Sequence, residues 1–197
     1  MKKKNRILIY PLIVMGMLLM LTNSCKKDEK KDDTTPTPVL AVGQSYQGGI
    51  IAYILQPGDT GYIAGQTHGL IAAPSDQSTG IQWYNGSYTT TGATATALGT
   101  GNANTNTIVT NQGTGSYAAK LCSDLVLGGY SDWYLPSKDE LNKLYINRTE
   151  IGGFAINYYW SSTEVDINNA LEQTFFYGIQ VYNNKSNTYY VRAVRAF

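Results

Sequence analysis

Beyond residue 45, short runs of apolar residues alternate with turn-forming clusters, and this pattern predicts the regular elements. Runs rich in β-branched and aromatic residues are typical of strands. Clusters of Gly, Pro, Asn and Ser, as at 57–61 and 183–187, predict turns between them. We therefore expect strands over 46–55, 69–73, 81–84, 158–163, 171–177, 179–182 and 189–197.

Two helices are expected between the early and late strands. The first covers 116–125 and is closed by a pair of glycines. The second begins at Ser137, because Ser137 and Glu140 have the spacing of a capping box and apolar residues follow at helical intervals. Helices in the middle and a run of strands at the end predict an α+β fold, with two or three short helices and an antiparallel sheet.

Residues 86–115 have low sequence complexity, with Gly, Thr, Ala and Asn in loose alternation. Only Ile108 and Val109 predict a packed position, and a short helix near 103–111 is the one regular element expected there. A segment of this length without secondary structure is usually functional or disordered. An aromatic-lined groove beside it would favour capture of a small molecule or a sugar.

The N-terminus combines a basic start, an uncharged apolar run over 7–21 and a cysteine. This order is the signature of a secretory signal. The small residue before Cys25 makes the end of the run resemble the bacterial lipobox. The resemblance implies a lipoprotein signal peptide over 1–24 and attachment of fatty acyl chains, such as palmitate, at Cys25. The alternative is an ordinary cleaved signal with an incidental cysteine.

Residues 25–40 predict a disordered tether, because charged residues and a Thr/Pro stretch cannot bury enough apolar surface to fold. Acidic residues close behind a lipidated cysteine resemble the surface-export signal of some Gram-negative lipoproteins. This implies a lipid-anchored protein of the outer membrane that faces the cell surface, with a folded domain over 41–197. The alternative is a plain solvated spacer, and either face of the outer membrane then stays open.

Charge and cysteine content argue against a nucleic-acid binder and a disulfide-bonded domain. Of the 15 Lys and Arg residues eight lie in 1–37, and of the 14 Asp and Glu residues four lie there, so the domain has seven basic and ten acidic residues and a net charge of −3. Binding to nucleic acid through bulk charge needs a basic surface, so no nucleic-acid partner is expected. Cys122 is the only cysteine beyond Cys25. It excludes an internal disulfide, and we expect a buried, unreactive thiol.

Four separate motifs resemble the Lcl C-terminal domain family, which is named after the terminal domain of a bacterial collagen-like adhesin. They occupy 128–137, 140–141, 159–163 and 190–195, and the resemblance extends over roughly 45–197. It implies a C-type-lectin-like α+β domain, and the adhesin is associated with sulfated glycosaminoglycans and trimerisation. This chain has no collagen-like tract and no basic surplus, and Tyr134 stands where the family motif usually has Arg, so polyanion binding and a trimer are in doubt.

The residues of these motifs are expected to stabilise the fold rather than to contact a ligand. Arg192 and Arg195 lie three apart on one predicted strand and should face opposite sides of the sheet. Asp132 and Glu140 are the candidate carboxylate partners for one of them. The structural set is Trp133, Leu135, Pro136, Glu140, Trp160, Arg192 and Arg195.

No catalytic set is expected, and the chain is therefore not predicted to be an enzyme. The single histidine, His68, lies in a Gly-rich turn and favours a structural role. Glu164, Asp166 and Asn168 follow the strand at 158–163 and are weak candidates for Ca²⁺, which prefers oxygen ligands. An ordinary polar turn is the alternative, and no cofactor is expected.

The sequence favours a cell-surface binding module for adhesion, with a glycan or another extracellular polymer as ligand. Tyr occurs 16 times and only 15% of residues are charged. Tyr and Trp give flat contact area at low entropy cost, as sugar binders require. The alternative is a structural or protein-interaction component of the cell envelope. The candidate contacts lie in or near predicted turns: Trp83, Tyr84, Asn85, Tyr88, Tyr182, Asn183 and Asn184.

Overall fold

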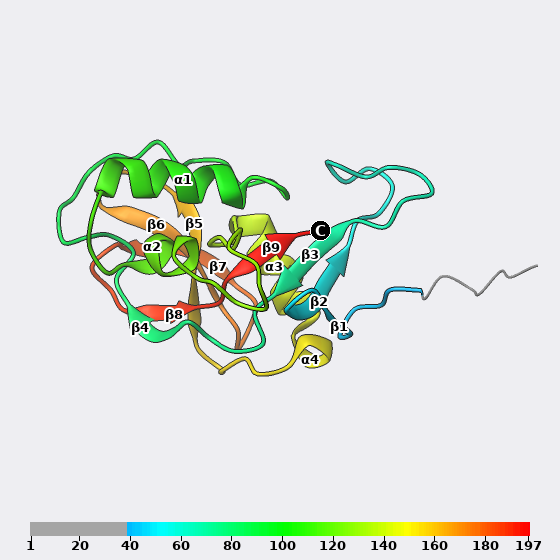
Figure 1. Ribbon diagram of the computed structural model, residues 1–197. Coiled ribbons are helices and arrows are strands. Elements are labelled where there is room, and N and C mark those ends of the chain that lie inside the picture. Colours follow the sequence, from blue (N-terminus) through cyan, green and yellow to red (C-terminus); the bar gives the residue numbers. More distant parts are fainter. Residues whose placement is uncertain (1–38) are drawn as a thin grey trace, which may run out of the picture. The chain divides into compact units, whose positions relative to one another are not determined.

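Nine strands form two sheets in the computed structural model, which describes residues 39–197 (Figure 1). The first sheet has the order β1-β2-β3-β9, with every pair antiparallel. The second has the order β4-β8-β5-β6-β7 and is antiparallel except between β5 and β8. The strands are β1 (Ser45–Tyr46), β2 (Gly49–Ile54), β3 (Gly69–Ala72), β4 (Ser78–Ile81), β5 (Tyr158–Glu164), β6 (Asn169–Thr174), β7 (Gln180–Asn184), β8 (Tyr189–Val191) and β9 (Val194–Ala196).

The predicted signal peptide at 1–24, the lipidation site at Cys25 and the tether up to residue 38 lie outside the described residues. Within 39–197, no helix is both long enough and apolar enough to cross a membrane.

Four helices occur in this part of the chain: α1 (Gly101–Gln112), α2 (Ala118–Ser123), α3 (Lys138–Ile146) and α4 (Arg148–Ile151). The capping box of α3 is confirmed, because Ser137 Oγ accepts from the Glu140 N–H at 3.3 Å and Glu140 Oε2 accepts from the Ser137 N–H at 2.7 Å. The α+β class is confirmed as well. The helix count was wrong, since four helices are described. The antiparallel pairing is confirmed, although the strands form two sheets and β5 and β8 pair in parallel. A C-type-lectin-like fold stays a prediction.

The low-complexity segment contains α1, the longest of the described helices. From the sequence we predicted only a short helix near 103–111. The buried face of α1 is mostly polar, with Ile108 as the one large apolar residue. Asn104 donates to the Ala95 carbonyl at 2.7 Å, and Thr105 Oγ1 accepts from the Leu135 N–H at 3.0 Å. Hydrophobic periodicity did not reveal the full length of the helix, because Asn104 and Thr105 bury polar side chains through hydrogen bonds beside the single large apolar residue Ile108.

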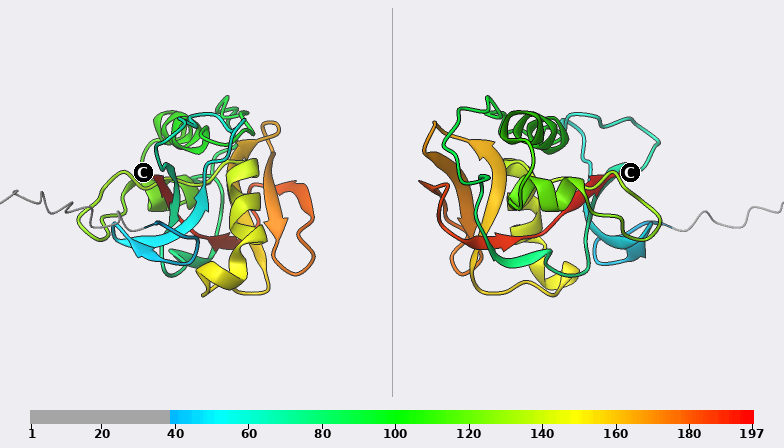
Figure 2. Two further views of the ribbon diagram at one scale, coloured as in Figure 1. Left: turned by 90° about the vertical axis from the view of Figure 1, so that its right-hand side faces the viewer. Right: turned by 60° about the vertical axis from the view of Figure 1, so that its left-hand side comes forward.

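Two hydrophobic clusters fill the interior, and neighbouring residues on one strand point into different clusters. Trp160 belongs to the first and Tyr159 to the second, and Trp133 and Tyr134 divide in the same way. Successive side chains on an extended chain point to opposite faces, so these segments are buried on both sides. Helix α3 lies against β2, β5 and β6, while α1 packs on α2 and β5 (Figure 2).

Four predicted strands differ clearly from the structure. The run 171–177 ends early, because β6 stops at Thr174 and residues 175–177 form a turn before β7. The run 46–55 is a hairpin of β1 and β2, because Gln47 and Gly48 adopt positive φ angles of 44° and 83° and turn the chain. The run 81–84 does not form a strand, and β4 ends at Ile81 before Trp83 enters the core. The run 189–197 is two strands, since the chain passes from the second sheet to the first between Val191 and Val194.

We predict that residues 38–197 fold without the preceding segment, because they form one compact unit with its own two-part core. Urea unfolding of this fragment should give coincident transitions by tryptophan fluorescence and far-UV circular dichroism. Transitions that separate, or a fragment without near-UV circular dichroism, would contradict the boundary.

Candidate functional site

Several predicted ligand contacts meet where three loops adjoin. The Tyr88 hydroxyl donates to Asn184 Oδ1 at 2.6 Å, and the Tyr84 and Tyr88 rings lie 4.7 Å apart. Asn85 is exposed next to them. We call residues 84–92, 164–169 and 183–187 the loop surface. It brings residues 84–92 together with two segments that lie more than 70 positions later in the chain.

Two predicted contacts on this surface are wrong, because Trp83 and Tyr84 are only 0% and 8% exposed. The Trp83 indole N–H donates to the Ser161 carbonyl at 2.8 Å and its ring is part of the core. Tyr182 is 64% exposed but lies on β7 opposite Leu171.

Although Asn183 lies in the loop-surface segment 183–187, its side chain points to Glu172 and not to Tyr88. Its amide donates to Glu172 Oε1 at 3.3 Å. Tyr88, Asn85 and Asn184 are therefore the predicted contacts that the structure gathers on the loop surface.

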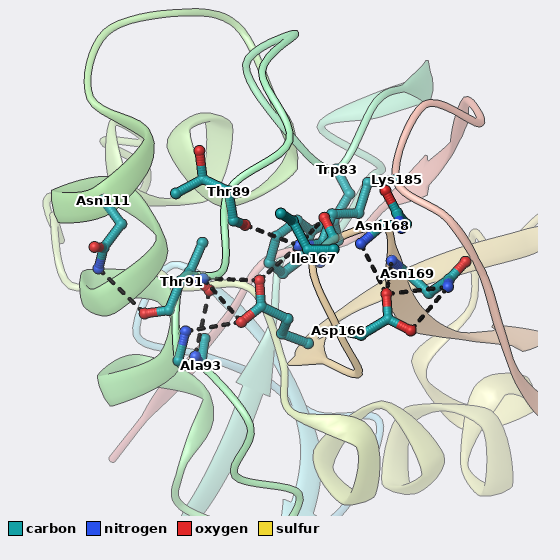
Figure 3. A network of polar contacts seen from close by, with 12 residues as sticks. Trp83, Thr89, Thr91, Ala93, Asn111, Asp166, Ile167, Asn168, Asn169 and Lys185 are labelled. Atoms are coloured by element: carbon teal, nitrogen blue, oxygen red, sulfur yellow. Dashed lines mark hydrogen bonds and ion pairs between the residues drawn. The ribbon is translucent and has the colours of Figure 1, made fainter.

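A buried ion pair between Lys185 and Glu164 connects the segments of the loop surface (Figure 3). Lys185 Nζ donates to Glu164 Oε1 at 2.5 Å and to the carbonyls of Thr89 and Ile167, both at 3.1 Å. The two ion-paired side chains are 0% and 1% exposed. The ammonium also lies 4.7 Å from the Trp83 ring centroid. All three N–H donors of the lysine thus tie separate loops together.

The calcium prediction fails at Glu164, whose carboxylate faces inward. It accepts from Lys185 and from the backbone N–H groups of Thr91 and Gly92, at 2.9 and 2.7 Å. Asp166 instead accepts from the backbone N–H groups of Asn168 and Asn169, which closes a turn (Figure 3). In 39–197 no three His, Cys, Asp or Glu side chains gather in one place.

A second candidate site was missed by sequence analysis. A hollow of about 390 Å³ opens between the loop 56–67, the start of α1, and strands β3 and β9. We call it the Tyr134 hollow. It adjoins residues 98–102 of the low-complexity segment, where a groove would favour ligand capture. Its apolar lining is Leu55, Ile63, Leu70, Leu98, Tyr134 and Phe197, and its polar lining includes Thr60, His68, Asn102 and Asp132.

Glu140 fixes the wall of the Tyr134 hollow. Its buried carboxylate accepts from Gly99 N–H at 3.0 Å, Gly101 N–H at 3.1 Å and the Tyr134 hydroxyl at 3.1 Å. Burial raises the pKa of Glu140, although the backbone donors of Ser137 and Gly99 act in the opposite direction. A Cβ atom at position 101 would collide with this carboxylate, so the approach requires glycine. Of the two candidate carboxylate partners for a motif arginine, Glu140 pairs with neither arginine. The prediction is confirmed at the other candidate, Asp132, which binds Arg195.

Each motif arginine has another partner. Arg195 binds both oxygens of Asp132, at 2.7 and 2.9 Å, and these hydrogen bonds lower the pKa of Asp132. Arg192 Nε donates to Asp76 Oδ1 at 2.7 Å, a partner that sequence analysis did not name. Both arginines are at least 94% buried.

The other members of the structural set lie in the interior. Trp133, Leu135 and Trp160 belong to the first hydrophobic cluster. Pro136 is buried next to the cap of α3, and its carbonyl accepts from the Ser162 N–H at 2.8 Å.

Two potentially reactive groups are engaged or buried. The His68 ring nitrogens lie 3.2 Å from the Phe197 carbonyl and 2.9 Å from Gln66 Oε1. Cys122 is fully buried in the first hydrophobic cluster, and burial raises the pKa of its thiol.

We predict that Lys185→Met lowers the free energy of unfolding by about 3–5 kcal/mol, because Glu164 is then left buried without a cation. Urea denaturation of residues 38–197 measures the change. Lys120→Met is the matched control: its partner Asp124 is 59% exposed, and the loss should stay below about 1 kcal/mol. Equal losses in the two variants would contradict the role of the buried pair.

Comparison with known proteins places these features in a family. The family model described as the Lcl C-terminal domain matches residues 73–195. A comparison with curated proteins finds no match. Among solved structures, a fimbrial protein from Bacteroides ovatus ATCC 8483 is similar, with 17% identity and a TM-score of 0.49. The similarity covers 74% of this chain and 43% of the fimbrial chain, so this chain spans less than half of that structure. Because the family model matches more than half of the residues and includes the motifs around Tyr134, Glu140 and Arg195, the chain belongs to the Lcl C-terminal domain family.

Proposed function

We propose that this chain is a lipid-anchored cell-surface module that binds a glycan or another extracellular polymer through the Tyr134 hollow. The observation that carries the proposal is the hollow itself, about 390 Å³ with mostly apolar walls and a few polar groups. A sugar ring presents C–H faces to apolar and aromatic walls and hydroxyls to polar side chains. Asp132, Asn102 and Thr60 supply such polar groups.

The walls of the hollow are held in place before any ligand arrives. The Glu140 carboxylate fixes Gly99, Gly101 and Tyr134 at distances of 3.0 to 3.1 Å. Asp132 is fixed by Arg195. Preorganised walls reduce the entropy lost on binding, which supports a recognition role.

We favour a binding module over an enzyme. The groups that could act as base or nucleophile are engaged or inaccessible, since His68 has two hydrogen-bond contacts and Cys122 has no exposure. Asp139 and Glu140 do not form a carboxylate pair, because Glu140 accepts four hydrogen bonds while Asp139 contacts Lys138.

The proposed location rests on the N-terminal sequence. The basic start, the apolar run 7–21 and Cys25 support export and acylation, and the acidic residues of 28–33 support display on the outer membrane surface. An acyl anchor with an extended tether would hold the domain in the medium without a spanning helix.

A second candidate function, contact with another envelope protein, is favoured by a separate observation. Phe176, Tyr177 and Ile179 lie together in the turn between β6 and β7 and are 55%, 71% and 54% exposed. Large apolar side chains gathered on one surface are typical of protein interfaces.

We predict that residues 38–197 bind a subset of neutral or sulfated glycans on an array, and that Asn102→Trp weakens this binding at least about tenfold by filling the hollow. The matched control is Asn106→Trp, one helical turn away on α1. Both changes remove the same Asn102–Asn106 hydrogen bond, but only Asn102 lines the hollow. A blank array, or equal effects of the two changes, would count against the proposal.

A separate prediction concerns the anchor. Cells that produce the full chain should incorporate labelled palmitate into it, and Cys25→Ser should abolish this incorporation and release the protein from the membrane fraction. Protease added to intact cells should degrade the wild-type domain. Unchanged palmitate labelling in Cys25→Ser would refute acylation at this residue.

A further inference from the structure

A hollow of about 440 Å³ lies over β5, β6 and the β6–β7 turn and has no part in the glycan proposal. We call it the Glu172 hollow. Its rim is apolar and open to solvent, with side chains that are 40% to 73% exposed. The rim side chains are Ile156, Tyr158, Phe176, Tyr177, Ile179 and Val181.

An acidic side chain lies at the floor of this apolar hollow. Glu172 stands on β6 between Trp160 of β5 and Val181 of β7, and the residue is 0% exposed. Oε1 accepts from the Asn183 amide at 3.3 Å, whereas Oε2 has no hydrogen-bond partner. A buried carboxyl oxygen without a donor is costly in a folded protein, so the fold retains it against its own stability.

The domain has no basic side chain left for Glu172. Five of the seven basic residues in 39–197 form ion pairs with other carboxylates, namely Lys120, Lys138, Lys185, Arg192 and Arg195. The remaining two lie over aromatic rings: Lys143 over Tyr53 and Arg148 over Tyr145, each at 4.2 Å. A cation for Glu172 therefore comes from outside the described residues.

Burial raises the pKa of Glu172 to about 7, and the Asn183 amide acts weakly against this shift. The titratable groups around the carboxyl are phenols, from Tyr158 on β5, Tyr177 in the β6–β7 turn and Tyr189 on β8. No cation of 39–197 faces it. An incoming cation would stabilise the ionised carboxyl and reverse the shift.

We propose that the Glu172 hollow binds a lysine or arginine side chain of a partner protein, with apolar residues of that partner covering the rim. This rests on the second candidate function. The apolar stem of such a side chain packs against the rim while its charged head reaches Oε2. Because Oε2 is shielded from solvent, the proposal requires the exposed rim side chains to turn outward as the charged head enters.

Two other occupants fit less well. A neutral sugar supplies hydroxyl donors but no charge to balance an ionised carboxylate. The lysines at 27–31 of this chain have only Lys, Asp and Glu as neighbours, and Lys26 follows Cys25, so this stretch has no apolar residue on both sides of a lysine to cover the rim. A separate protein with a basic residue between apolar residues would supply both a cation for Glu172 and apolar side chains to cover the rim.

The test uses residues 38–197, the compact folding unit, and the capped peptide acetyl-Val-Lys-Val-amide as the probe. NMR should show shifts confined to β5–β7 and the turn 174–180, and the pKa of Glu172 should fall by at least about one unit at saturation. Affinity should rise as pH rises from about 6 to about 8, because Glu172 ionises while lysine keeps its proton.

Two carboxyl-to-amide variants test whether peptide binding depends on the charge of Glu172. Glu172→Gln keeps the shape of the side chain and should weaken peptide binding about tenfold, whereas Glu150→Gln, at an exposed carboxylate on α4, should not. Glu172→Gln should leave glycan binding unchanged, and Asn102→Trp should leave peptide binding unchanged, so the two proposals fail independently. The proposal is overturned by equal affinity in wild type and Glu172→Gln, by an unmoved pKa, or by binding of n-butylammonium as tight as that of the peptide.

Discussion

The fold depends on how one C-terminal segment is held where it passes between the two sheets. β8 belongs to one sheet and β9 to the other, and Arg192 lies at the crossing. Its guanidinium binds Asp76 at 2.7 Å and the carbonyls of Ala73 and Gly153 at 3.0 and 2.5 Å, and it lies 4.1 Å from the Phe154 ring. Removal of any partner would leave a buried charge or carbonyl unsatisfied. The Arg192 contacts therefore hold the two sheets in position where β8 continues into β9.

Buried polar groups replace disulfides as the internal restraints of this domain. The Lys185–Glu164 pair ties the loop surface, and the Glu140 carboxylate ties α3 to the start of α1. Each of these groups has the donors or acceptors that its charge requires. Glu172 differs, because one oxygen lacks a partner and every basic side chain of 39–197 is engaged elsewhere. That contrast is the physical basis for assigning Glu172 to an intermolecular contact.

The two proposed sites use different elements. The Tyr134 hollow is built from β3, β9, the loop 56–67 and α1, whereas the Glu172 hollow is built from β5, β6 and the β6–β7 turn. Neither set of lining residues includes a member of the other. Under the two proposals, a polymer would occupy one site while a protein partner occupies the second. The two affinities could then be changed separately.

The sequence by itself determined the elements whose signal is local. The Ser137–Glu140 capping box, the strands around Ile71 and Trp160 and the α+β class follow from spacing over a few residues. Tertiary structure alone decided where the polar side chains point. Helix α1 was predicted only in part, near 103–111, because its buried face carries Asn104 and Thr105 beside the single large apolar residue Ile108. Trp83 was predicted as a surface contact, but its indole N–H donates to a carbonyl 78 positions away. A hydrogen-bond partner distant in the chain leaves no trace in local pattern, and both hollows are enclosed by segments that only folding brings together.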